Sequence, residues 1–201
     1  QSPRHHFLRR VVPSLGIQGA SDNTGGTVLV MELARVFRQT GTRRTLRFVA
    51  WGSEELGLRG SVFYIKDLKK RHKEAREAEA FVKGRDRTEL EQHRLCVNLD
   101  VHGAILGQNH AMILGPADLT AAARLLAKET GMAHEVAEEV YSSDGTPLSE
   151  GSIPSVSFSR SGGTTSFLHS PRDVIDWLSP EALERSGRFV ELFLRRYVAE
   201  A

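Results

Sequence analysis

The chain has 201 residues, of which 40% are hydrophobic, 26% are charged and one is a cysteine. This size fits one domain with a continuous core, and a single cysteine excludes a disulfide-stapled scaffold. The formal net charge is only +2 and both signs are intermixed, so nucleic acid is not the expected partner. The longest early apolar run, 28–31, is far below the roughly 20 residues of a membrane span. We therefore expect a soluble chain, either cytoplasmic or secreted.

Helical and strand patterns alternate along the chain, which predicts an α/β domain with a mostly parallel sheet between helices. β-Favouring residues predict strands at 45–51, 95–101, 111–114 and 153–159. Helical spacing of apolar residues predicts helices at 27–39, from about 61, at 118–128 and from 180 onward. The sequence contains no evident repeat or linker, so we expect 1–201 to be a single domain.

Capping residues mark the ends of two of these helices. Asp118 is the expected N-cap of the helix 118–128, which we expect to end before Gly131. Ser179 is the expected N-cap of the last helix, with Pro180 in its first turn.

Ionisable side chains interrupt this pattern where expected strands and loops meet. Glu54 and Glu55 follow an expected strand, and Asp100 lies at the end of another. Asp22 lies in a loop of small residues that enters a helix, and His169 lies in a later polar loop. Taken alone, each also fits a structural role, such as a helix cap for Asp22. Because ligands of open α/β sheets bind beyond the carboxyl ends of the strands, these positions are candidates for one site.

The same segments carry too few basic residues to neutralise their carboxylates, so a metal ion is the simplest partner. Imidazole together with carboxylate suits zinc, and a carboxylate-rich cluster can hold two ions through one bridging group. Two ions about 3.5–4 Å apart can activate a water for hydrolysis. Neighbouring side chains of extended backbone point in opposite directions, so one residue of the pair Glu54 and Glu55 can bind metal while the other acts as general base.

Five sequence blocks, in this order and context, resemble the M28 family of co-catalytic zinc aminopeptidases. The blocks are 19–23, 45–51, 54–61, 98–100 and 169–173. The resemblance runs from about position 6 to the last helix. It implies a three-layer α/β domain of the zinc-exopeptidase, phosphorylase/hydrolase-like class. In this family the domain usually begins with strands ahead of the first histidine motif, so we expect those strands to be absent from this chain.

The resemblance also implies a role for each matching residue. Asp22 matches the ligand that bridges two zinc ions, and Glu54 matches the general base. Glu55 and His169 match the ligands that complete the second zinc site. A Ser-Asp block resembles another family segment and gives Asp144 a supporting role.

The first zinc site is where the sequence departs from the family. Asp100 matches one ligand, and a histidine of an upstream His-x-Asp motif should complete the site. Both His5 and His6 are available, and we favour His6, but neither has an aspartate two residues later. At Leu168 many relatives place a tyrosine or another polar donor that stabilises the oxyanion, which leucine cannot do.

By this resemblance the chain is a metalloprotease that removes the N-terminal residue from peptides with a free N-terminus, using metal-activated water and two zinc ions. Three alternatives remain. The first is a glutaminyl cyclase or carboxypeptidase activity of the same fold, the second is a non-catalytic binding module, and the third is an enzyme with one zinc. The sequence leaves open the side-chain preference, the oligomeric state and the compartment.

Overall fold

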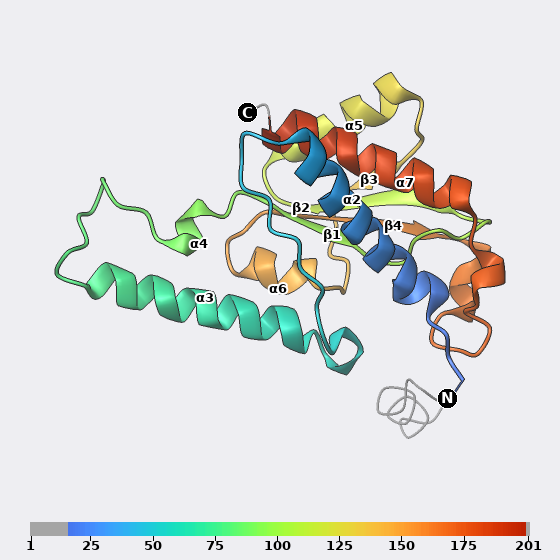
Figure 1. Cartoon of the computed structure of the whole chain (residues 1–201), viewed down its shortest axis with the longest axis horizontal. Coiled ribbons are helices and arrows are strands. Elements are labelled where there is room, and N and C mark those ends of the chain that lie inside the picture. Colours follow the sequence, from blue (N-terminus) through green and yellow to red (C-terminus); the bar gives the residue numbers. More distant parts are fainter. Residues whose placement is uncertain (1–15, 200–201) are drawn as a thin grey trace.

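The computed structural model describes residues 16–199. Both candidate histidines of the first zinc site, His5 and His6, lie outside the described residues. The described part of the chain contains a four-stranded sheet in the order β1-β4-β2-β3 (Figure 1). Its strands are β1 (Cys96–Leu99), β2 (Gln108–Leu114), β3 (Glu135–Ala137) and β4 (Ser155–Ser161). The pairs β1–β4 and β2–β3 are parallel, and β2–β4 is antiparallel, so the sheet is mostly parallel as predicted.

Helices cover both faces of this sheet and form the outer two of three layers (Figure 1). The first face is covered by α2 (Gly26–Thr40), α5 (Ala117–Thr130) and α7 (Pro180–Phe193). The second face is covered by α3 (Arg59–Glu77) and α6 (Gly145–Glu150), and the short α4 (Glu89–Gln92) lies in the connection to β1. The predicted three-layer α/β class is confirmed.

The two layers of helices pack on two hydrophobic clusters. The larger cluster lies between the sheet and α2, α5 and α7, where Phe158 of β4 meets the rings of Phe189 and Phe193 edge to face. The smaller cluster joins α3 to α6 and consists of Ile65, Leu68, Leu148 and Ile153. Burial of these side chains supplies most of the stabilisation of the fold.

Successive residues of β4 alternate between the two faces, as the period of a strand requires. Val156 and Phe158 belong to the larger hydrophobic cluster, whereas the alternate residues Ser155 and Ser157 are buried polar residues. At Gly145 in α6, a Cβ atom would lie only 3.0 Å from the hydroxyl oxygen of Ser157. Glycine at this position therefore lets α6 approach the polar face of the sheet closely.

The predicted strand 45–51 is wrong, because this stretch is not paired with any strand in the described part of the chain. A cavity of 490 Å³ is lined both by this stretch, including Leu46 and Phe48, and by Leu95 and Val97 at the beginning of β1. The composition of 45–51 favours extended backbone but carries no information about a hydrogen-bonding neighbour. The other three predicted strands correspond to β1, β2 and β4 with shifted ends, and the three-residue β3 was missed.

The predicted caps are partly confirmed. Gly131 ends α5 in the left-handed conformation, with φ 65°. Ser179 caps α7, because its hydroxyl oxygen accepts a hydrogen bond of 3.1 Å from the backbone N–H of Ala182. Asp118 is not the N-cap of α5, since Pro116 holds that position and Asp118 lies in the first turn. A carboxylate in the first turn still interacts favourably with the helix dipole.

Within residues 16–199, none of the helices combines the length and the apolar character that crossing a membrane requires.

Candidate metal centre

The predicted site residues lie in the loops at one edge of the sheet. Asp22 lies in the turn that leads into α2, Glu54 and Glu55 in the turn that precedes α3, Asp100 directly after β1, and His169 in the loop between β4 and α7. Segments far apart in sequence are thus brought to a common edge, as the rule for open α/β sheets predicts.

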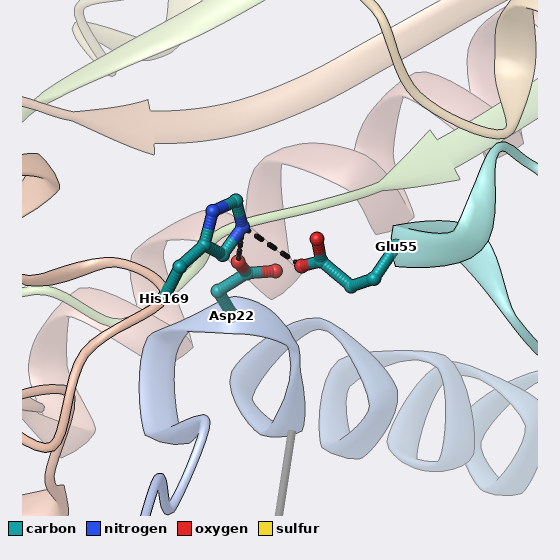
Figure 2. A group of neighbouring side chains, drawn as sticks. All are labelled: Asp22, Glu55 and His169. Carbon is teal, nitrogen blue, oxygen red and sulfur yellow. Dashed lines mark ion pairs between the residues drawn. The ribbon is translucent and has the colours of Figure 1, made fainter. Parts of the chain in front are cut away.

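Asp22, Glu55 and His169 form one compact group (Figure 2). One potential ligand atom from each lies within 4.8 Å of the other two. His169 Nε2 is 2.9 Å from Asp22 Oδ2 and 2.8 Å from Glu55 Oε1. These hydrogen bonds, first to Asp22 and then to Glu55, raise the pKa of His169 to about 10. A protonated imidazole at this place supplies the positive charge that a metal ion would supply to the same carboxylates.

A cavity of 220 Å³ adjoins this group. Its wall contains five carboxylates and, among the described residues, no lysine, arginine or histidine. The carboxylates are those of Asp22, Glu54, Glu55, Asp100 and Asp144. So many acidic groups around one cavity are costly unless a cation meets them. The donor set of carboxylate oxygens and one imidazole nitrogen fits zinc.

Two of these carboxylates have strongly raised pKa values. Burial, followed by the charges of Asp100 and Glu55, raises the pKa of Glu54 to about 8. Burial also raises the pKa of Asp100 to about 6, against the opposing effect of a hydrogen bond from Ser143. Both shifts have the sign expected for a carboxylate that lacks a positive partner, and a bound cation would reverse them.

Buried hydrogen bonds from two serine hydroxyls support Asp100 and Asp144. The hydroxyl of Ser143 donates to Asp100 Oδ2 at 2.6 Å, and the side-chain amide of Asn98 donates to the Ser143 oxygen at 2.8 Å. Because Asn98 occupies an acceptor position of that oxygen, the hydroxyl proton of Ser143 is directed at Asp100. The hydroxyl of Ser61 in α3 donates to Asp144 Oδ1 at 2.5 Å.

The backbone at the site has an uncommon conformation at three positions. Ser53, Val101 and His169 have φ values of 59°, 58° and 56°, in the left-handed region that residues other than glycine rarely adopt. Ser53 directly precedes Glu54, and Val101 directly follows Asp100. Such conformations cluster at functional sites, where the surrounding structure enforces them.

Sequence reasoning missed the supporting residues of the site. Asn98 lies two residues before Asp100, so strand alternation could have placed both on one face. Ser61 lies in the block 54–61, but its hydrogen bond to Asp144, 83 positions away in the sequence, could not be predicted. His102, two residues after Asp100, is a buried packing residue, with 1% of its surface exposed and its Nε2 2.9 Å from the carbonyl oxygen of Phe158.

The chain is similar to known peptidases in sequence and in fold. The model of peptidase family M28 matches residues 6–194. Aminopeptidase YwaD of Bacillus subtilis is 28% identical over 181 residues, which cover 86% of this chain and 36% of that protein. Among solved structures, the zinc aminopeptidase BSAP of Bacillus subtilis is similar with a TM-score of 0.73 and 26% identity, over 92% of this chain and 44% of that one. A Porphyromonas gingivalis glutaminyl cyclase shares the fold, with a TM-score of 0.60 and 18% identity.

This chain spans less than half the length of the two Bacillus relatives. The family match nevertheless extends over most of the chain and includes the loops that carry Asp22, Glu55 and His169. The chain belongs to peptidase family M28.

Proposed function

We propose that this chain is a zinc-dependent aminopeptidase that removes the N-terminal residue from peptides with a free N-terminus. The observation that carries the proposal is the convergence of Asp22, Glu55 and His169 beside a cavity lined by carboxylates. Family membership and the likeness to a zinc aminopeptidase support it.

In this proposal Asp22, Glu55 and His169 would hold one zinc ion. Asp22 would also serve a second ion, together with Asp100 and an upstream histidine, for which His6 is our assignment. Zinc bound here would polarise the scissile carbonyl and lower the pKa of a water. Asp144, held by the hydroxyl of Ser61, has a supporting role.

Glu54 is the proposed general base. Its carboxylate takes a proton from the attacking water and later delivers it to the amine of the leaving peptide. A base of this kind works best when its pKa lies near the working pH. In the metal-free protein burial raises the pKa of Glu54, and a bound zinc ion would lower it again, so that the carboxylate is ionised and able to accept the proton. The same acidic cavity would attract the free amino group of the substrate.

The test compares wild type with Glu54→Gln, using Glu150→Gln on the exposed end of α6 as the matched control. Wild type and control should bind two zinc ions per chain and should hydrolyse aminoacyl-p-nitroanilides with free, but not acetylated, amino groups. Glu54→Gln should keep its zinc and lose about 10²- to 10⁴-fold in kcat, the usual contribution of a general base. Near-normal turnover of Glu54→Gln would overturn the assignment.

Two further readouts separate the alternatives. A peptide with N-terminal glutamine reports cyclisation if pyroglutamate forms in place of a released amino acid. Zinc content distinguishes two ions per chain from one, and a chain without zinc or turnover would indicate a binding module.

A further inference from the structure

Asp173 is a buried carboxylate that links two loops of the site. Only 2% of its surface is exposed. Its Oδ1 accepts hydrogen bonds from the backbone N–H of Ser21 at 2.9 Å and from the Ser21 hydroxyl at 2.7 Å. Its Oδ2 accepts a third bond, at 3.0 Å, from the backbone N–H of Asp22. The backbone carbonyl of Asp173 accepts a fourth from the N–H of Ala20 at 3.3 Å.

These bonds connect the loop that carries Asp22 to the loop that carries His169. Asp173 lies four residues after His169, and its own N–H donates to the carbonyl of Ser170 at 3.1 Å, which closes the His169 loop on itself. The distance of 2.9 Å between His169 Nε2 and Asp22 Oδ2 therefore depends on how Asp173 holds the two loops together.

A carboxylate is the group that this position requires. Two of the three donors that face it are backbone N–H groups, which no substitution can remove, and all three need an acceptor. Asparagine has nearly the same shape but would turn an NH₂ group toward one of these donors. In the described part of the chain, no ion pair with a basic side chain offsets the burial of Asp173, so its desolvation is compensated by hydrogen bonds.

We propose that Asp173 is a positioning residue of the metal centre: it fixes Asp22 against His169 and thereby sets the affinity for zinc. The inference rests on the proposed function, because it assumes that these two side chains bind the metal. Asp173 is not proposed as a ligand, since it is not part of the group of potential ligand atoms and both of its oxygens accept hydrogen bonds from the loop of Asp22. Supporting partners of this kind typically contribute about 10- to 100-fold to metal affinity.

The test measures zinc affinity of the metal-free protein by competition with a chromophoric chelator, for wild type, Asp173→Asn and Asp176→Asn. Asp176 is exposed on the same segment and is the matched control. We expect a loss of about 10- to 100-fold for Asp173→Asn and no loss for Asp176→Asn. Thermal unfolding of the metal-free proteins is recorded in parallel. A variant that is less stable but binds zinc with wild-type affinity per folded molecule would show a merely structural role and overturn the proposal.

Ser21→Ala keeps the test decisive if Asp173→Asn does not fold. This variant removes one donor and leaves both backbone N–H groups in place, so a smaller loss of zinc affinity, about 2- to 10-fold, is expected. Unchanged affinity in Ser21→Ala would then overturn the proposal. If wild type binds zinc and all variants match it, only the role of Asp173 fails. A wild-type chain that binds no zinc overturns the proposed function together with this inference.

Discussion

On one face of the sheet, Val156 and Phe158 of β4 pack into the hydrophobic cluster beneath α5 and α7. On the other face, Ser155 and Ser157 of the same strand are buried near α6, beside Asn98 of β1. The first face contributes contacts that are non-directional and depend on the apolar area removed from water. The second contributes directional hydrogen bonds that continue from Asn98 to the edge of the site.

This difference separates stability from function within one strand. A change on the apolar face should lower the free energy of unfolding and leave the geometry of the site intact in the molecules that remain folded. A change on the polar face should weaken metal binding with a smaller effect on unfolding. Variants of each face test this separation.

Phe158→Ala should have the largest effect on stability. Removing a fully buried aromatic ring leaves a cavity between β4 and α7, and the expected loss in the free energy of unfolding is about 3–5 kcal/mol. Denaturant titration measures this loss, and Phe63→Ala on α3, where 73% of the residue is exposed, is the control. Folded Phe158→Ala should still bind zinc like wild type, and loss of zinc from the folded fraction would contradict the separation.

Ser143→Ala should have an effect of intermediate size, and this effect should be on zinc affinity rather than on stability. The variant removes the donor to Asp100 Oδ2, so the carboxylate becomes less well oriented and harder to ionise. We expect a loss of about 10- to 100-fold in affinity for the ion that Asp100 holds. The neighbouring, exposed Ser142→Ala is the control. Equal zinc affinity in the two variants would show that the polar face does not support the site.

The smallest expected effect is a pH dependence of the free energy of unfolding, caused by a histidine on the apolar face. The ring of His134 stacks on that of Phe189, with 3.7 Å between the ring centroids. Burial lowers the pKa of His134, with smaller contributions from the charges of His110 and Arg160. The hydrogen bond that His134 Nδ1 donates to the backbone carbonyl oxygen of Met132 opposes this shift. Because the unfolded chain then binds a proton more readily than the folded one, stability falls as the pH drops below the ordinary histidine value of about 6.5.

Titration of one histidine can change the free energy of unfolding by at most about 1.4 kcal/mol per pH unit. Unfolding free energies at pH 7.5 and pH 5.5 should therefore differ more in wild type than in His134→Gln. The same pH dependence in both proteins would show that His134 does not contribute.

The sequence predicted well those features that depend on local pattern. The capping of α7 by Ser179 follows from short-range chemistry, and the meeting of Asp22, Glu55 and His169 was expected from motif order. Their roles as ligands stay predictions. The lack of a strand partner for 45–51 among the described residues could not be predicted, because a strand requires a partner that its own residues do not specify. The link from Asp173 to Ser21 joins residues 152 positions apart and was invisible for the same reason.

The left-handed backbone of Ser53 and Val101 has a consequence for laboratory evolution. Each such residue costs on the order of 1–3 kcal/mol, a considerable part of the roughly 5–15 kcal/mol by which a domain is stable. A selection for heat resistance alone is expected to replace these residues with glycine, because glycine adopts this conformation without steric cost. It would thereby free Glu54 and Asp100 from their enforced directions. Variants selected for heat resistance and variants selected for activity should therefore differ first at positions 53 and 101.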